Sequence, residues 1–347
     1  MNENLINYCK AYPKIQPQDV FKYIFHSAFG CEHLVSDENT VLEYIRHEYE
    51  NVSKTEVPFT ERLDGNYSRV YLSWMNSGLK PQTLAKLFVL SAKKEPDGNA
   101  LLEEKIETAK KLAKEGNLPF EESYFQKCLD EWCEKGHPAV HHSDVFRAEY
   151  RPAYRVIANK YAPFMRLFAE IDNLSDKESM IVAIEGGSAS GKTTLAAILK
   201  EVYDCNVFHV DDFFLRPEQR TPSRFAEIGG NVDRERFSEE ILQPLLKKET
   251  VNYRPFECST QTLGDVISVM PKKLTVVEGV YSTHPAFSKY YDISVFLDID
   301  PEQQKERVLR RNGEKLAKRF FDEWVPLENR YFSGTDIKGR SDLIFDV

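Results

Sequence analysis

One short segment near the middle of the chain has the composition of a phosphate-binding loop. Residues 182–197 read VAIEGGSASGKTTLAA, so glycines, serines and a lysine stand between an apolar run and a helix-forming run. The Walker A pattern GxxxxGK[ST] is met by Gly186, Gly191, Lys192 and Thr193. Glycines let successive backbone N–H groups turn inward around an anion, and a helix start adds its positive dipole end. The segment therefore predicts a loop that binds nucleotide phosphates.

The residues of this loop have distinct expected roles. Lys192 should reach the β- and γ-phosphates, and the Thr193 hydroxyl should bind Mg²⁺. We expect ATP and Mg²⁺ as ligands, with the nucleotide held along the whole loop: Gly186, Gly187, Ser188, Ala189, Ser190, Gly191, Lys192, Thr193 and Thr194. By itself such a loop suits a GTPase switch, an ATPase motor or a phosphotransferase, so residues further along the chain must decide.

Two carboxylates follow apolar, strand-like runs. NVFHVDDFFLRP places Asp211 directly after one run, and LTVVEGVY places Glu278 at the end of another. The carboxyl ends of parallel strands share one edge of a sheet, where open α/β sheets bind ligands. Asp211 is thus the candidate base that accepts a proton from an attacking hydroxyl, and Glu278 is a candidate Mg²⁺ partner of Thr193. The alternatives are an ordinary acidic turn and a helix cap.

A basic segment near the C-terminus completes the set. ERVLRRNGEKLAKRF contains a cluster of cationic side chains, namely Arg307, Arg310, Arg311, Lys315, Lys318 and Arg319. Arginines beside a phosphate loop stabilise the charge of a transferring phosphoryl group, so Arg310 and Arg311 join Lys192 and Asp211 as catalytic candidates. For any single arginine, a solvated helix face is the alternative.

Around these residues the sequence pattern indicates two regions. Residues 180–347 alternate short β-rich runs with helical runs, which predicts an α/β domain with a parallel sheet flanked by helices. Residues 1–172 carry apolar residues at helical spacing and predict a mainly α-helical domain of unknown role, with YSRVYLSW extended and residues 150–171 as its last helix. Residues 173–179 are polar and are expected to form a linker.

Composition narrows the class of protein. The 347 residues suit two domains, and the formal net charge of −9 argues against a general nucleic-acid-binding surface. The six cysteines form no CxxC pair, no apolar run approaches a membrane span, and the N-terminal residues lack a secretion-signal core. We expect a cytoplasmic protein with a small-molecule substrate and without nucleic-acid or membrane partners; a homo-oligomer stays open.

The order of these motifs resembles the uridine kinase family, which groups with phosphoribulokinase, pantothenate kinase and nicotinamide riboside kinase. GGSASGKTT, DDFF, GGNVDRERF, VVEGVY and the arginine-rich segment carry the resemblance, which covers residues 180–347. It implies an ATP-dependent kinase that phosphorylates a hydroxyl of a small molecule, most simply a nucleoside. The alternatives are another hydroxylated metabolite, such as nicotinamide riboside, pantothenate or a sugar, or a nucleotide-sensing protein without turnover.

The resemblance also implies particular roles. The family's base falls on Asp211, its Mg²⁺-associated glutamate on Glu278, and its ribose-binding aspartate on Asp233. Arg254 and Tyr281 lie in the matching stretches and are further substrate-binding candidates. One departure concerns the stretch FECSTQTL, which lacks the histidine and arginine that help uridine kinases bind the nucleoside. It weakens uridine as the acceptor and leaves the phosphoryl-transfer residues in place.

The N-terminal region resembles only uncharacterised bacterial proteins, through HSAFGCEHLVSD and GHPAVHHSDVFRAEYRPAYRV. It holds residues of metal-ligating type, namely His26, Cys31, Glu32, His33, His137, His141 and His142. Their spacing matches no standard zinc pattern, so buried or helix-end histidines are expected instead. An intermediate hypothesis is that polar groups such as His141, Arg147 or Arg151 contact a substrate.

Overall fold

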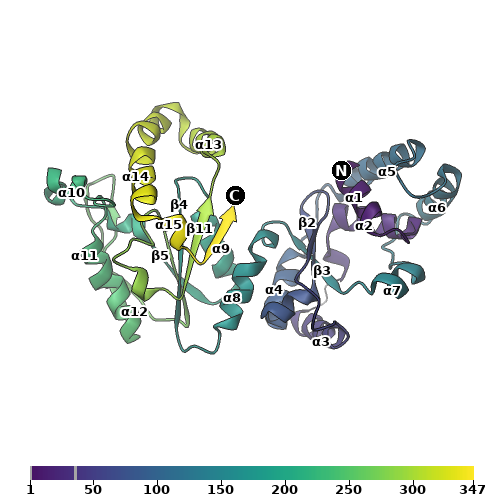
Figure 1. Ribbon diagram of the computed structural model, residues 1–347, viewed down its shortest axis with the longest axis horizontal. Helices are drawn as coiled ribbons and strands as arrows, with labels where there is room; N and C mark the ends of the chain where they lie inside the picture. The colour runs from purple at the N-terminus through teal and green to yellow at the C-terminus, as the bar shows by residue number, and fades with distance from the viewer. Residues whose placement is uncertain (1, 35–36) are drawn as a thin grey trace. The chain divides into compact units, whose positions relative to one another are not determined.

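The structure, a computed structural model, describes residues 2–34 and 37–347. They form two compact units, Met1–Asn173 and Leu174–Val347 (Figure 1). Within the described residues, no helix combines the length and the apolar character that crossing a membrane requires.

The N-terminal unit is mainly helical. Helix α2 buries an apolar stripe that includes Val20, Phe21 and Ile24, and it packs against α5 and α6. The α-helices are α1 (Asn2–Ala11), α2 (Pro17–Phe29), α3 (Glu38–Tyr49), α4 (Pro81–Ser91), α5 (Gly98–Lys114), α6 (Glu122–Glu134), α7 (Asp144–Tyr150) and α8 (Met165–Asn173).

This unit also contains a three-stranded antiparallel sheet in the order β1 (Thr60–Arg62), β2 (Tyr67–Tyr71), β3 (Tyr154–Ala158). The extended conformation expected for YSRVYLSW is confirmed for Tyr67–Tyr71, which form β2, but is wrong for Leu72, Ser73 and Trp74, which begin the 3₁₀ helix Leu72–Ser77. The single helix expected over residues 150–171 is wrong, because its first part is β3, which pairs with β2 from Tyr154 to Ala158. Pro152 disfavours a helix at the residue before it, and pairing with β2 satisfies the backbone of β3.

The C-terminal unit is built on a five-stranded parallel sheet in the order β12-β11-β4-β10-β5. Its strands are β4 (Met180–Gly186), β5 (Cys205–His209), β10 (Leu274–Glu278), β11 (Ile293–Asp298) and β12 (Leu343–Asp346). The α-helices are α9 (Lys192–Val202), α10 (Pro222–Ala226), α11 (Arg234–Phe237), α12 (Gln243–Lys247), α13 (Pro301–Arg319), α14 (Val325–Thr335) and α15 (Ile337–Arg340).

Helices cover this sheet and close its core. Helix α9 packs against β4, β5 and β10. A separate cluster joins Ile181, Phe208 and Val277 of the sheet to Phe237 and Ile241, which lie in the segment from α11 to α12. The predicted fold class, a parallel α/β sheet flanked by helices and preceded by a mainly helical region, is confirmed.

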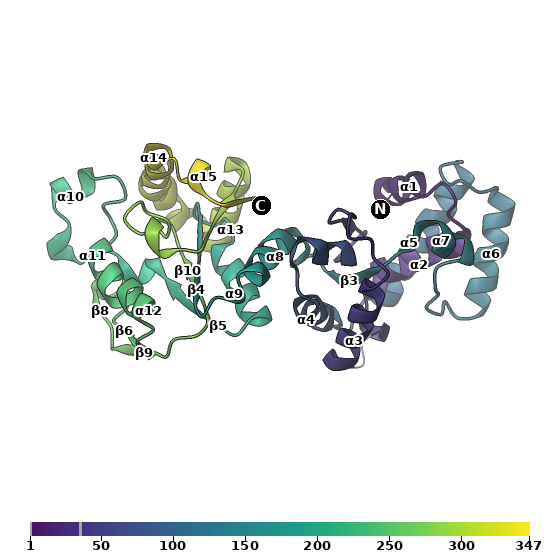
Figure 2. The same cartoon turned by 60° about the horizontal axis from the view of Figure 1, so that its bottom comes forward.

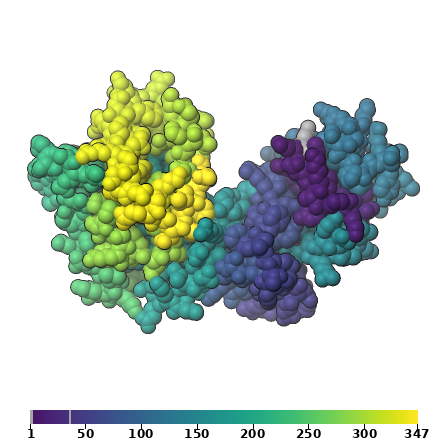
Figure 3. Space-filling model, viewed as in Figure 1, coloured from purple at the N-terminus to yellow at the C-terminus, as the bar shows by residue number. Residues whose placement is uncertain are grey.

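Smaller elements complete the unit. Two antiparallel strand pairs, β6 (Val251–Tyr253) with β9 (Ile267–Val269) and β7 (Phe256–Glu257) with β8 (Thr262–Leu263), extend from the segment after α12. Figure 2 shows β6, β8 and β9 beside α11 and α12. The last residues of the chain, yellow in Figure 3, lie at the surface of this unit, where β12 forms an edge of the sheet.

The register of the sheet brings the predicted motifs to one edge. Glu278, the last residue of β10, is aligned with Ile184 of β4 and with His209, the last residue of β5. The phosphate-loop motif follows β4, and Asp211 lies two residues beyond β5. All three strand ends therefore open onto the same side of the sheet.

Candidate active site

The phosphate loop takes a conformation that only its glycines permit at two positions. Gly186 has φ of 148°, and a Cβ there would lie 2.6 Å from the carbonyl oxygen of Leu297. Gly191 has φ of 98° and directly precedes Lys192, the first residue of α9. The first-turn N–H groups of a helix have no partner within the helix, so those of α9 are available to an anion at the loop. The loop thus fits the phosphates of a nucleotide.

The side chain of Lys192, the first residue of α9, folds back against the phosphate loop. Its Nζ donates to the carbonyl oxygens of Gly186 and Gly187, both at 2.9 Å, and its side chain is almost fully buried. The two carbonyl contacts hold the ammonium beside the loop, where its charge would face a bound phosphate.

A carboxylate from α14 occupies part of the same loop. Glu328, which is 4% exposed, accepts hydrogen bonds from the backbone N–H of Ser188, at 2.9 Å, and from the Ser188 hydroxyl. Burial raises the pKa of Glu328, while the Ser188 donors, Lys192 and Arg311 lower it. An anion therefore already uses one of the donors that the loop offers.

Thr193, in the first turn of α9, and Glu278, at the end of β10, form a hydrogen-bonded pair of oxygen-bearing side chains. The Thr193 hydroxyl donates to Glu278 Oε1 at 3.0 Å, and His209 Nδ1 lies 2.6 Å from the same oxygen. The Glu278 contact raises the pKa of His209, so the charged imidazole is favoured beside the carboxylate. A hydroxyl and a carboxylate are oxygen ligands of the kind that Mg²⁺ takes, so this pair fits the ion.

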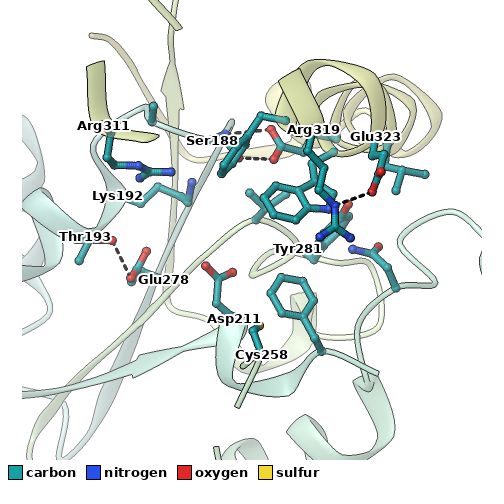
Figure 4. Close-up of a pocket in the computed structure, with 18 of the residues that line it drawn as sticks. Ser188, Lys192, Thr193, Asp211, Cys258, Glu278, Tyr281, Arg311, Arg319 and Glu323 are labelled. Carbon is teal, nitrogen blue, oxygen red and sulfur yellow. Dashed lines mark hydrogen bonds and ion pairs between the residues drawn. The ribbon is translucent and has the colours of Figure 1, made fainter. Parts of the chain in front are cut away.

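Asp211 faces the same space from the end of β5. It follows His209 by two residues in a short 3₁₀ turn, Val210–Phe213. The side chain of Asp211 is exposed, and it lines a cavity whose walls are formed by other protein atoms. Desolvation by these atoms raises the pKa of Asp211, Lys192 lowers it, and Glu278 raises it. Figure 4 shows the carboxylate directed toward the space between Glu278 and Lys192.

A cavity of about 990 Å³ joins these groups. The predicted site residues that line it are Ser188, Ala189, Gly191, Lys192, Thr193, Thr194, Asp211, Glu278, Tyr281, Arg310 and Arg311. Gly186, Gly187 and Ser190 do not line it, and two of them instead provide the carbonyl oxygens that accept from Lys192. The cavity is large enough for a nucleotide beside a small acceptor.

Arginines of α13 cover one side of the cavity. Arg307, Arg310, Arg311 and Arg319 all line it. Arg319 donates to Glu323 at 2.9 Å, whereas the guanidinium of Arg311 lies 5.6 Å from the ring centre of Phe320. Figure 4 shows Arg311 on the side of Lys192 and Arg319 beside Glu323. Of these two, Arg311 is the better placed to face phosphates.

Aromatic rings form another wall near Asp211. Phe214, Phe225, Phe256 and Tyr281 come from the segment after β5, from α10, from β7 and from the loop after β10. Cys258 and Gln261 also line the cavity, and both belong to FECSTQTL, the stretch that lacks the histidine and arginine expected of uridine kinases. This wall offers flat apolar contacts with few charges, which suits an acceptor with a planar part.

Two predicted substrate residues lie elsewhere. Asp233 caps α11, accepting from the backbone N–H of Arg236, and also accepts from Gln219 Nε2 at 2.7 Å. Arg254 donates to the carbonyl oxygens of Gly264 and Leu263, at 2.6 and 3.0 Å, and so braces the β7–β8 segment. Neither residue lines the cavity. Both therefore support neighbouring segments in this conformation.

Sequence reasoning missed three groups at the site: His209, Glu328 and Glu185. Glu185 is fully buried in β4 and accepts from the N–H groups of Gly186, Tyr281 and Thr283, at 3.0, 3.2 and 3.1 Å. Burial raises its pKa to about 7 against the opposing effect of these donors. An acidic residue within the apolar run MIVAIE was a usable signal for Glu185, whereas nothing local marked Glu328.

The N-terminal histidines do not form a metal cluster in the part of the chain that is described, since no group of three or more His, Cys, Asp or Glu side chains there could hold an ion. His26 and His142 are buried.

In comparisons with known proteins, sequence similarity extends over somewhat less than half of the chain. No protein-family model matches the chain. It is 28% identical over 141 residues to a uridine kinase of Chlamydia pneumoniae, a match that covers 38% of this chain and 62% of that protein, which is less than two thirds of its length. It is 29% identical over 154 residues to a uridine kinase of Geobacillus kaustophilus (strain HTA426), which covers 42% of this chain and 72% of that protein.

A solved structure, described as that of a possible uridine kinase from Bacillus stearothermophilus, aligns with 52% of this chain and 100% of its own at 21% identity, with a TM-score of 0.40. The resemblance to uridine kinases that the motifs indicated is thus confirmed for about half of the chain.

Proposed function

We propose that the C-terminal unit is an ATP-dependent kinase that transfers the γ-phosphoryl group to a hydroxyl of a small molecule with a planar part, of which a nucleoside is the simplest example. One observation carries the proposal: Asp211 lines the same cavity as the phosphate loop, Lys192 and the Thr193–Glu278 pair. The sequence likeness to uridine kinases supports it. The aromatic wall supports a planar acceptor.

The chain's residues would divide the reaction as follows. Asp211 accepts the proton of the acceptor hydroxyl as its oxygen attacks the γ-phosphorus, and the bond to the β-phosphate oxygen breaks, which releases ADP. Its raised pKa makes this carboxylate a better proton acceptor than an ordinary aspartate. Lys192 and Arg311 stabilise the charge on the phosphoryl oxygens. When bound at Thr193 and Glu278, Mg²⁺ would neutralise phosphate charge.

The position of Glu328 favours a second candidate, a nucleotide sensor without turnover. Its carboxylate already occupies Ser188 of the phosphate loop, so ATP must displace it, and such an exchange could move α14 without any chemistry. The two candidates differ in Asp211: a sensor can lose this carboxylate with little effect, whereas a kinase cannot.

The test is a panel of acceptors with the full-length protein, ATP and Mg²⁺, read by product mass. The panel holds uridine, cytidine, nicotinamide riboside, pantothenate and simple sugars. With the acceptor that reacts, Asp211→Asn should keep ATP binding and lose turnover by a factor of about 10² or more. Lys192→Ala should weaken both. Asp212→Asn is the matched control, because this neighbouring carboxylate does not line the cavity.

ATP binding without product from any acceptor would overturn the kinase assignment and favour the sensor. Equal turnover in Asp211→Asn and the parent protein would remove Asp211 from the mechanism.

A further inference from the structure

The N-terminal unit has a cavity of its own, of about 390 Å³. It lies among α2, α3, α4, α7, β3 and the segment that precedes α7, all within the N-terminal unit. His141 and Arg147, which the sequence had marked as polar groups able to contact a substrate, both line it; Arg151 does not. Its volume lies within the range of small-molecule sites in proteins.

The charges around this cavity are mainly positive. Lys22, Arg147 and Arg155 line it, and Glu48 is the acidic residue among its lining groups. Glu48 is paired with Arg155 at 2.7 Å, and Arg147 is paired at 2.5 Å with Asp144, a carboxylate that does not line the cavity. Lys22 Nζ donates to the backbone carbonyl of Val140 at 3.1 Å, which carries no formal charge. A negative ligand would therefore meet an excess of cations, and a metal ion would be repelled.

Lys22 is desolvated without a carboxylate partner of its own. Burial, together with the nearby charges of Arg69 and Arg147 and against the opposing effect of Asp19, lowers the pKa of Lys22 to about 8. Asp19 is nevertheless occupied, because its two oxygens accept from His142 Nδ1, Gln16 N–H, Ser143 N–H and the Ser143 hydroxyl. A bound anion would supply the counter-charge that Lys22 lacks.

Uncharged polar side chains also line the cavity, namely His26, His142 and Tyr154. His142 Nδ1 lies 2.8 Å from Asp19, and its Nε2 lies 2.6 Å from the Tyr154 hydroxyl. Burial lowers the pKa of His142 to about 4, so the neutral ring donates from Nδ1 to Asp19 and accepts from Tyr154. His26 lines the cavity at 2% exposure, and its Nδ1 has no hydrogen-bond partner within the described residues.

Apolar and aromatic side chains also line the cavity. Val41, Tyr44 and Phe88 line the cavity together with these polar groups, and Tyr44 is 62% exposed. A ligand that fills the space would therefore meet both cationic and apolar side chains. Inorganic phosphate alone would leave the apolar side chains uncovered.

We propose that this cavity is a binding site for a phosphate monoester with an apolar or aromatic organic part. The phosphate lies against Lys22, Arg147 and His26, and the organic part lies against Tyr44 and Phe88. Two cations and an imidazole donor suit a doubly charged phosphate better than they suit a singly charged carboxylate ligand. The site is contained in the N-terminal unit and does not depend on the function proposed for the C-terminal unit.

The test is calorimetric titration of the full-length protein with phenyl phosphate, phenol, benzoate and inorganic phosphate. We expect phenyl phosphate to bind at least about tenfold more tightly than the other three, because each of them lacks one of the two features. Lys22→Met and Arg147→Gln should each weaken phenyl phosphate at least about fivefold. Lys192→Ala is the control for the phosphate loop and should leave this binding unchanged.

Proton uptake on binding distinguishes a direct role of Lys22 in holding the anion from a purely structural role, because a structural role would not change it. If the anion restores the charge of Lys22, binding takes up protons at pH 8.5, where the free ammonium is partly deprotonated, and takes up far fewer at pH 7. Titrations in buffers of different ionisation enthalpy measure this uptake, and Lys22→Met should abolish it. The methionine side chain suits a buried position, so this variant is expected to fold, which thermal unfolding checks.

Several results would overturn the proposal. They are absence of phenyl phosphate binding at millimolar concentration, equal affinity for phenol, tighter binding of benzoate, and loss of binding in Lys192→Ala. Unchanged affinity of folded Lys22→Met for phenyl phosphate would show that the ligand does not bind in this cavity.

Discussion

Replacing His142 should make the N-terminal unit much less sensitive to acid. His142 is 5% exposed and its pKa falls from an ordinary 6.5 to about 4. Between these two pH values the unfolded imidazole binds a proton and the folded one does not. Unfolding therefore takes up protons in this window, and the free energy of unfolding decreases as the pH falls. At about 1.4 kcal/mol for each tenfold difference in proton affinity, the full effect is about 3 kcal/mol.

The informative variant is His142→Asn. The introduced amide keeps an N–H near Asp19 Oδ1 but does not titrate. From pH 7 to pH 4.5, the free energy of unfolding of the parent protein should fall by about 2 kcal/mol more than that of the variant. His26, whose pKa burial also lowers, is present in both proteins, so its contribution cancels in the comparison. Loss of the Tyr154 contact lowers stability equally at both pH values.

The assay is urea unfolding followed by tryptophan fluorescence in a Trp324→Phe background. The remaining tryptophans, Trp74 and Trp132, both lie in the N-terminal unit, so the signal reports this unit alone. His141→Asn serves as a matched control, because it removes the adjacent, exposed histidine and leaves the Asp19 contact intact. If parent and His142→Asn lost stability in parallel, within about 0.5 kcal/mol, His142 would not be held neutral and the linkage argument would fail.

The remaining predictions concern the C-terminal unit. Glu328→Gln should tighten ATP binding several-fold, by about 1 kcal/mol, because the carboxylate competes with phosphate for Ser188; unchanged or weaker affinity by calorimetry would contradict this. Glu278→Gln should raise the Mg²⁺ concentration needed for half-maximal ATP binding about tenfold or more, and an unchanged Mg²⁺ titration would exclude Glu278 as a ligand. Gly186→Ala should destabilise the unit by about 2 kcal/mol or more, because its Cβ would lie 2.6 Å from the Leu297 carbonyl; a chemical denaturation midpoint like that of the parent would refute it.

Several features of the fold followed from local patterns. The alternation of β-rich and helical runs after residue 180 predicted the parallel sheet, because strands buried on both faces are continuously apolar. Residues 150–171 show the limit of that reasoning. Their apolar spacing was compatible with a helix, but pairing with β2 made Tyr154–Ala158 a strand. That pairing involves residues about ninety positions away in the chain, so no local pattern contains it.

The site shows the same division. The sequence by itself determined the phosphate loop, because the groups that curl around an anion are neighbours in the chain and their conformation depends on the glycines among them. It also marked Asp211 and Glu278, because one follows and the other ends an apolar run, and the two corresponding strands end at one edge of the sheet. The tertiary structure alone decided that Glu328 occupies Ser188, that His209 contacts Glu278, and that Asp233 caps a helix. These contacts depend on how distant segments pack, and a hydrogen bond between residues 140 positions apart leaves no periodicity in either segment.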